Sequence, residues 1–282
     1  MARGEIPRRS PMSETALLAP VQPERHSDLF WLVSDVRIMA RRSIMHIIRS
    51  LDQVLSLILF PVMFMLLNRY VLGGAIDTGD VSYANYLFAG ILIQTLAFGA
   101  NYTTINLAVD MKEGIVDRFR SLPMSSNALI IGHITADLVR NIISGIIIVL
   151  AGFAVGFRPN ASAVEWLYVI GLALLFTLAI SWLSAILGLL VKSLEAAQWV
   201  GFVLIFPLTF VSSAFVPTHT MPGVIRTFAE NQPMTHAINA IRAWLVGTPP
   251  GDAVWLSIIW SVALITISIP ITGWLFRRHA VQ

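Results

Sequence analysis

Residues Trp166 to Val191 read WLYVIGLALLFTLAISWLSAILGLLV, 26 consecutive positions without a charged residue. A helix that crosses about 30 Å of hydrocarbon, at about 1.5 Å per residue, needs about 20 such residues. This stretch therefore predicts a transmembrane helix. Five further stretches meet the same test, with limits near Val54–Leu72, Tyr86–Val109, Asn141–Phe157, Trp199–Val216 and Trp255–Phe276. We expect an all-α integral membrane protein with six transmembrane helices.

The composition of the whole chain agrees with this class. Of its 282 residues, 56% are hydrophobic and 12% are charged, whereas about 25% are charged in an ordinary soluble domain. Mean hydropathy is +0.74. The absence of cysteine excludes disulfide scaffolds, cysteine zinc sites and thiol nucleophiles. Because the six histidines form no HExxH motif, we also expect no metal site.

The basic residues divide the ends and loops between two sides of the membrane. Fifteen of the 19 Lys and Arg residues fall in the N-terminal segment, the even-numbered loops and the C-terminal end. The other side has only Arg69, Arg158, Arg226 and Arg242. Since Lys and Arg are retained preferentially on the cytoplasmic side, we expect both termini to be cytoplasmic.

Two segments precede the first span. Residues 1–27 are rich in Pro, Ser and charge, which predicts a disordered cytoplasmic tail; a regulatory or lipid-binding arm is the alternative. Residues 28–50 carry apolar positions at helical spacing with arginines on the opposite side. That pattern predicts an amphipathic elbow helix in the membrane interface, with a helix packed on a partner as the alternative. The transmembrane domain then covers residues 51–282.

The loop between the second and third spans, residues 110–126, reads DMKEGIVDRFRSLPMSS. Ile115, Phe119 and Leu122 recur at three- to four-residue spacing, and Pro123 ends the pattern. We predict a short amphipathic cytoplasmic helix at about 111–122. Held between two spans, such a helix could transmit a push from a soluble partner. The alternative is a solvated loop.

A third unusual segment, at about 218–247, lies between the fifth and sixth spans. It is too apolar for an ordinary exterior loop, and neither half is long enough to span. Pro222 and Pro233 mark two helix starts, and Gly247 with the prolines after it marks an end. We predict a re-entrant helical hairpin packed against protein. An amphipathic pair resting on the outer headgroups is the alternative.

The chain resembles the transmembrane subunit of type-2 ABC exporters, and within them the daunorubicin/doxorubicin-resistance permease group. The resemblance covers about residue 30 to the C-terminus. It rests on EGIVDRFRSLPMS (113–125), on SSAFVPTHTMPGVIRTFAENQPMTHAINAIR (212–242) and on six spans with both ends inside. The sequence departs from the family at Gln232, which separates Asn231 from Pro233 where the family often reads Asn-Pro.

The resemblance implies an elbow helix, six spans, a coupling helix and a V-shaped hairpin. It also implies two permease chains, a homodimer being favoured over a heterodimer, each docked on an ABC ATPase subunit that binds ATP and Mg. The expected substrate is an amphipathic drug, lipid or secondary metabolite, and the expected location is the bacterial inner or plasma membrane. The resemblance assigns Glu113, Asp117, Arg118, Phe119 and Arg120 to the coupling surface. It assigns Pro222, Pro233, Thr235 and Arg242 to the extracellular hairpin.

No GxxxxGK[ST] sequence occurs, so the chain has no Walker A loop and the ATPase must be a separate chain. We expect no catalytic residue, no cofactor and no nucleic-acid partner for this chain. One alternative is an ion-coupled secondary carrier, but only Asp137 is an acidic residue near a span centre. The other is an intramembrane enzyme, for which no GxSxG or GxGD motif occurs.

Polar side chains inside the spans are the candidates for a substrate path, because they tend to face protein or water. They form one stripe on the second span and one on the fifth, each with aromatic neighbours. The candidate lining residues are Gln94, Phe98, Asn101, Tyr102, Phe202, Phe206 and Thr209. An aromatic and amide lining suits large amphipathic substrates. The alternative for each polar residue is a hydrogen bond between helices.

Overall fold

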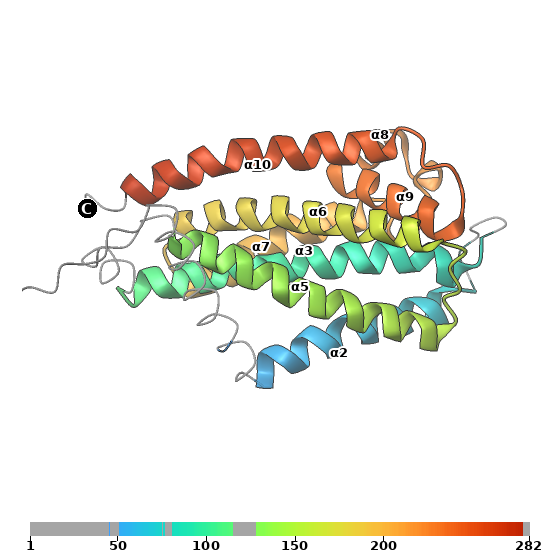
Figure 1. Ribbon diagram of the computed structural model, residues 1–282, viewed down its shortest axis with the longest axis horizontal. Coiled ribbons are helices and arrows are strands. Elements are labelled where there is room, and N and C mark those ends of the chain that lie inside the picture. The colour runs from blue at the N-terminus through green and yellow to red at the C-terminus, as the bar shows by residue number, and fades with distance from the viewer. Residues whose placement is uncertain (1–44, 46–50, 75, 77–80, 115–127, 279–282) are drawn as a thin grey trace, which may run out of the picture.

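The computed structural model describes residues 45, 51–74, 76, 81–114 and 128–278. Six longer helices run side by side (Figure 1). They are α2 (Leu51–Leu67), α3 (Tyr83–Lys112), α5 (Ala128–Val155), α6 (Ala163–Leu190), α7 (Leu194–Phe210) and α10 (Ala253–Arg278). The π-helix η2 (Asn68–Leu72) extends α2. The 3-10 turn η3 (Thr218–Thr220) and the short helices α8 (Gly223–Asn231) and α9 (Pro233–Val246) lie between α7 and α10.

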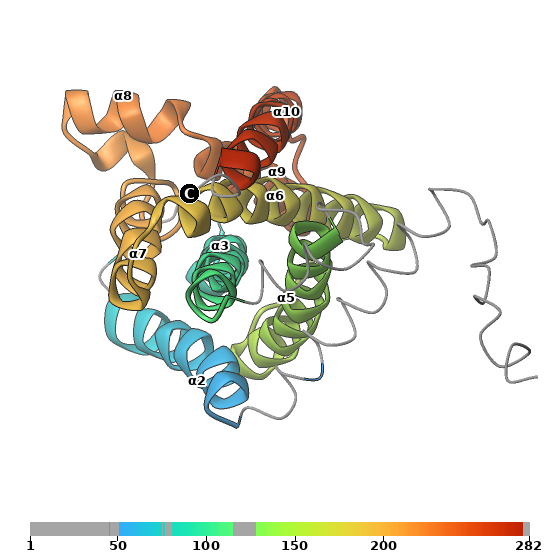
Figure 2. The same cartoon turned by 90° about the vertical axis from the view of Figure 1, so that its left-hand side faces the viewer.

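Helix α3 is the centre of the bundle. Seen end-on, it is surrounded by α2, α5, α6 and α7, while α10 lies outside α6 (Figure 2). Nearly all of α3 is buried, although it is the least apolar of the long helices. Glycines permit the close packing: a Cβ on Gly90 would lie 2.3 Å from the carbonyl oxygen of Ala214, and one on Gly188 would lie 2.9 Å from that of Thr104.

Four of the described helices, α3, α5, α6 and α10, are long and apolar enough to cross a membrane. Two shorter apolar helices accompany them, Leu59–Val71 and α7. The described part of the chain is therefore all-helical, and the protein is of the multi-pass membrane type. The predicted tail at 1–27, the predicted elbow helix at 28–50 apart from Met45, and residues 115–122 of the predicted coupling helix lie outside the described residues.

The start of the third span is wrong in the sequence prediction. We expected it at Asn141, but α5 is continuous from Ala128, thirteen residues earlier. His133, Asp137 and Arg140 lower the apolar character of this first half, so a search for apolar stretches misses it. The structure shows that all three side chains are buried and bonded inside the bundle.

The fifth span also differs from its prediction, because α7 ends at Phe210 rather than near Val216. The hydroxyl of Ser212 donates to the carbonyl oxygen of Thr209 at 2.5 Å and accepts from the backbone N–H of Ala214 at 3.1 Å. Serine side chains that bond the local backbone compete with helical hydrogen bonds. The chain therefore turns at this point, towards the segment that leads to α8.

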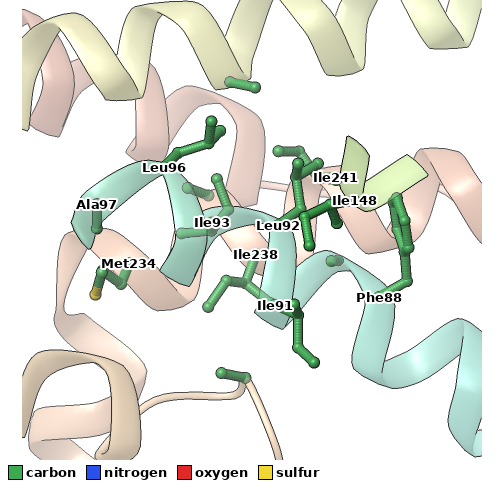
Figure 3. Close-up of a cluster of buried hydrophobic side chains, with 14 of the residues drawn as sticks. Phe88, Ile91, Leu92, Ile93, Leu96, Ala97, Ile148, Met234, Ile238 and Ile241 are labelled. Carbon is green, nitrogen blue, oxygen red and sulfur yellow. The ribbon is translucent and has the colours of Figure 1, made fainter. Parts of the chain in front are cut away.

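A core of aliphatic side chains joins α3, α5 and α9 (Figure 3). Ile91 and Ile93 of α3 meet Ile238 and Ile241 of α9, all four fully buried. The α9 helix starts with Pro233 at its first turn and ends at Gly247, whose φ of 82° is the left-handed conformation that suits glycine. Burial of this apolar face fixes α9 against α3.

Candidate functional site

A cavity of about 880 Å³ lies between α2, α3 and the start of α7. One wall is α3, which contributes Gln94, Phe98, Asn101 and Tyr102. The opposite wall is α2, which contributes aromatic and aliphatic side chains, and Gln198 of α7 adds a further amide. No charged side chain is among the described residues that line it. The cavity thus combines aromatic faces with uncharged hydrogen-bonding groups.

A continuous row of aromatic rings runs along α7 beside this cavity. Consecutive rings from Trp199 through Phe202 and Phe206 to Phe210 have centroids 6.0, 4.9 and 4.2 Å apart. Each of these four side chains is more than one third exposed. Phe202 also lies 6.1 Å from the cavity residue Phe98, ring to ring. The row therefore extends the aromatic lining of the cavity over the surface of α7.

A polar cluster lies behind the cavity wall, at mid-length of α3, α5 and α6. Arg140 and Asp137 of α5 form an ion pair, and both side chains are at most 2% exposed. Asp137 also accepts hydrogen bonds from the hydroxyls of Thr103 and of Ser181, the latter at 3.2 Å. The guanidinium carbon of Arg140 lies 4.6 Å from the centre of the Tyr102 ring. Tyr102 and Gly99, which both contact Arg140, also line the cavity.

Several polar atoms in this layer have no hydrogen-bond partner in the part of the chain that the structure describes. They are Nε and Nη1 of Arg140, Oδ1 of Asn101, and both amide atoms of Asn141. Two glycines make the close contacts here. A Cβ on Gly201 would lie 1.6 Å from Oδ1 of Asn101, and one on Gly99 would lie 2.0 Å from Oδ1 of Asn141.

The C-terminal end of α3 carries the one described residue that the resemblance assigns to a coupling surface. Glu113 is exposed and forms the C-cap of α3, with its N–H donating to the carbonyl oxygen of Val109 at 2.9 Å. Gly114, at φ 66°, then takes the chain out of the helix. The other residues assigned to this surface, Asp117, Arg118, Phe119 and Arg120, lie outside the described residues.

The four hairpin residues have distinct places in the structure. Pro222 is the N-cap of α8, and Pro233 occupies the first turn of α9. Thr235 is buried and accepts a hydrogen bond from the N–H of Ser213 at 3.4 Å. Arg242 donates to Asn239 Oδ1 at 2.9 Å and to backbone carbonyl oxygens of α3 and of residue 213. These residues join the hairpin to α3 and to the end of α7.

Gln232 fills the position where the sequence departs from the family pattern. It is both the last capping residue of α8 and the first of α9. Its side-chain amide donates at 2.6 Å to the carbonyl oxygens of Leu208 and Val211. Those are acceptors at the end of α7, so Gln232 ties the corner of the hairpin to the last turn of that helix.

The structure brings together four of the seven predicted pathway residues, Gln94, Phe98, Asn101 and Tyr102, on one cavity wall. Phe202 and Phe206 belong to the adjoining aromatic row. Thr209 differs from the prediction: it is fully buried, and its hydroxyl donates to the carbonyl oxygen of Ile205 at 2.8 Å. It packs within the protein and does not line the cavity.

Sequence reasoning missed several residues of the site. Phe60 and Phe64 were read only as part of an apolar span, and Gln198 was placed outside one. Thr103 and Ser181, which bond Asp137, carry no periodic signal of their own. The usable signal was on α5, where polar residues at positions 133, 137, 140, 141 and 144 follow helical spacing and mark a buried face.

Comparisons with known proteins agree on the family. The model of the ABC-2 type transporter family matches residues 34–246. A daunorubicin resistance ABC transporter permease protein of Streptomyces coeruleorubidus is 29% identical over 226 residues, 80% of each chain. A probable doxorubicin resistance ABC transporter permease protein of Mycobacterium tuberculosis is 23% identical over 261 residues, 90% of this chain and 93% of that one. Nodulation protein J of Rhizobium leguminosarum bv. trifolii is 26% identical over 176 residues, which are 62% of this chain and 66% of that one.

These matches confirm the resemblance that was carried by residues 113–125 and 212–242. The matched region covers α2 to α9, including the cavity, the polar cluster and the hairpin. The relatives are permease subunits, and the family implies partnership with an ABC ATPase subunit. The chain belongs to the ABC-2 type transporter family and is a membrane permease subunit of an ABC exporter.

Proposed function

We propose that this subunit exports an amphipathic drug, lipid or secondary metabolite through the cavity between α2, α3 and α7. The observation that carries the proposal is the joint placement of Gln94, Phe98, Asn101 and Tyr102 on one wall of an 880 Å³ cavity. Aromatic faces give large molecules dispersion contacts, and uncharged amides give hydrogen bonds without the cost of desolvating a charge.

The pathway requires six membrane crossings, with α2 continued by η2 and α7 added to the four longer helices. The order of the helices supports this count. The end of α3, the start of α5, the α6–α7 turn and the end of α10 all lie at one end of the bundle (Figure 1). Lys112, Lys192, Arg277 and Arg278 lie there, so the positive-inside rule makes this end cytoplasmic. The proposed location is a bacterial inner membrane with both termini inside.

Energy comes from a separate chain in this proposal. The permease binds no cofactor and has no catalytic activity of its own, and ATP and Mg bind to the partner ATPase. The ATPase docks at the cytoplasmic end of α3, where Glu113 is exposed and where the predicted coupling helix begins. Asp117, Arg118, Phe119 and Arg120 complete the docking surface, with Phe119 as its apolar anchor.

Two copies of the permease form the working unit, most simply as a homodimer. The exposed aromatic row of α7, from Trp199 to Phe210, supports this arrangement, since a second copy would cover it and extend the pathway. At the outer end, α8 and α9 form a hairpin that enters the membrane from outside. The apolar residues Val224 and Phe228 of α8 are exposed and would contact the outer half of the bilayer.

The test is transport in inverted membrane vesicles that contain the permease and its co-purified ATPase. The probe is daunorubicin, whose fluorescence reports uptake. Asn101→Leu and Phe98→Ala should each reduce ATP-dependent uptake several-fold while the ATPase stays bound. Phe153→Ala on α5 removes an aromatic side chain that is 40% exposed and outside the cavity, so it is the matched control. Equal uptake by all four proteins would contradict the pathway.

The same vesicles separate this proposal from an ion-coupled carrier, the second candidate. Asp137 is a buried carboxyl near mid-span, the kind of group that such carriers use. In the structure it is bonded to Arg140, Thr103 and Ser181. Uptake driven by an imposed proton gradient without ATP would support the carrier, whereas uptake that needs ATP supports the exporter.

A further inference from the structure

A second hollow lies on the other side of α3, between α5 and α6. It has a volume of about 380 Å³, and Leu92 and Leu96 of α3 form its floor. Its outer end is at Trp166 and its inner end is at Asn141 and Thr177. All its other lining side chains are apolar, and none of the lining residues is charged. We call this hollow the α5–α6 groove.

The groove opens towards the hydrocarbon of the membrane. The helices that form its walls, α5 and α6, are two of the four that are long and apolar enough to span. Its rims are apolar and exposed: Ile142 is 44%, Ile146 56% and Ile170 50% exposed. From Leu150 to Asn141 the groove follows nine residues of α5, about 14 Å at about 1.5 Å per residue. That length is about half the thickness of the hydrocarbon layer.

The inner end of the groove holds a polar group without a partner. Asn141 is 1% exposed, and neither its amide oxygen nor its amide nitrogen forms a hydrogen bond with any residue that the structure describes. Its oxygen lies against Gly99 of α3. The hydroxyl of Thr177, which lies beside it, donates a hydrogen bond to the carbonyl oxygen of Ala173 at 2.8 Å. A buried amide with no partner is costly, so the site calls for a hydrogen-bonding group that the described residues do not supply.

We propose that the α5–α6 groove binds one chain of a membrane lipid that carries a hydroxyl group near the middle of the chain. The apolar part of that chain fills the groove between Trp166 and Gly145. Its oxygen meets the amide of Asn141 at the inner end, which satisfies donor and acceptor needs that a plain acyl chain would leave unmet. The site is separate from the cavity on the α2 side and does not depend on the transport pathway.

The first experiment measures binding to the full chain in nanodiscs of phosphatidylcholine. A trace phospholipid with a photoactivatable diazirine in its acyl chain labels the protein, and the labelled peptides are identified by mass spectrometry. We expect label on residues 142–150 and 169–177. A phosphatidylcholine with a mid-chain hydroxystearoyl group should displace the probe about five-fold better than its stearoyl counterpart, the effect of about one net hydrogen bond.

Two variants make the result specific. Gly145→Phe fills the groove, and it can be accommodated because the nearest atom to an added Cβ is Leu92 Cδ1 at 4.0 Å. It should abolish the label on both peptides. Gly273→Phe on α10, where nothing lies within 4 Å of an added Cβ, is the matched control and should leave the label unchanged. Asn141→Leu should keep the label and remove the preference for the hydroxylated lipid.

Three outcomes would overturn the proposal. The first is label that avoids both peptides, and the second is a hydroxyl preference that survives in Asn141→Leu. The third is a second copy of the chain in the groove. Because the chain has no native cysteine, Ile146→Cys tests this alone: oxidation in the membrane should leave it monomeric on a gel. A disulfide-linked dimer would mean that protein covers the groove. Size-exclusion profiles that match wild type show that each variant is folded, and Gly145→Leu replaces Gly145→Phe if that variant is not.

Discussion

Arg140 and Arg242 lie about one hundred positions apart in the sequence, yet they dock on α3 in the same way. Each guanidinium lies over a tyrosine of α3, Tyr102 at 4.6 Å and Tyr86 at 3.7 Å from the ring centre. Each also donates to an α3 carbonyl oxygen, that of Gly99 at 2.7 Å or of Tyr86 at 3.1 Å. Arg140 is on α5 inside the bundle, and Arg242 is on α9, between α7 and α10.

The two arginines differ in how completely they are bonded. Nε, Nη1 and Nη2 of Arg242 all donate to neutral oxygens, and no carboxylate is involved. Arg140 has a carboxylate partner in Asp137, but its Nε and Nη1 have no partner among the described residues. A fully bonded arginine holds one arrangement. Unpaired donors next to a cavity permit a second arrangement of the side chain. We therefore interpret Arg242 as a clamp that holds α9 on α3, and Arg140 as part of a polar cluster that can rearrange.

The strongest test of this difference is the loss of the charged partner of Arg140. Asp137→Ala should destabilise the protein by about 3–5 kcal/mol, because it leaves a buried guanidinium without its counter-charge. The double variant Asp137→Leu with Arg140→Met removes both charges and should lose much less. Chemical unfolding in detergent measures both. A single variant no less stable than the double would contradict the ion pair.

Loss of the clamp should have a smaller but still large effect. Arg242→Met removes the hydrogen bonds to the carbonyl oxygens of Tyr86 and Ser213 and should cost about 2–3 kcal/mol. Arg242→Lys should recover only part of this stability. An ammonium group cannot stack on the Tyr86 ring and donate to several oxygens at once, as a guanidinium does. Hydrogen exchange should show the loss concentrated in α9. Uniform loosening of all helices would argue against a local clamp.

A pair of glycines on α3 compares the rigidity of the two regions directly. An added Cβ would meet the Ala214 backbone oxygen at 2.3 Å from Gly90, near the clamp, but the Asn141 side chain at 2.0 Å from Gly99. The backbone oxygen of Ala214 cannot move away from an added methyl group, whereas the side-chain amide of Asn141 can rotate away from one. Gly90→Ala should therefore cost about 2 kcal/mol and Gly99→Ala about 1 kcal/mol, by the same unfolding assay. The reverse order would show that the middle layer is the stiffer one.

The exposed Arg226 shows how much burial adds to the stabilising effect of an arginine. It pairs with Glu230 on α8 at 2.8 Å, with both side chains about half exposed. Arg226→Ala should shift the midpoint of unfolding too little to detect. The hydrogen bond from Arg226 holds the pKa of Glu230 below its ordinary value. Any small contribution is therefore present above the ordinary carboxyl pKa and lost as the pH falls through the lowered one. A large loss at neutral pH would contradict this.

The two regions also differ in how well the sequence predicted them. The hairpin carries residues that determine the backbone conformation at their own positions. They are Pro222 and Pro233 at helix starts and Gly247 at a helix end. The middle layer depends on partners that are distant in sequence. Nothing near Asp137 indicates that Thr103 and Ser181 will bond it, although the spacing of His133, Asp137 and Arg140 does place these three on one helix face. Thr209 was misjudged for a related reason, because a hydroxyl can be satisfied by its own helix.

The central position of α3 has a consequence for biogenesis. A translating ribosome releases the chain in order, so α3 reaches the membrane before α5, α6 and α7, the helices that later enclose it. On its own it offers the insertion machinery the least apolar of the four long helices, with Gln94, Asn101 and Asp110 facing whatever surrounds it. Stable integration of this helix must then wait for the rest of the bundle, and a truncated chain that stops after α3 should be released or degraded.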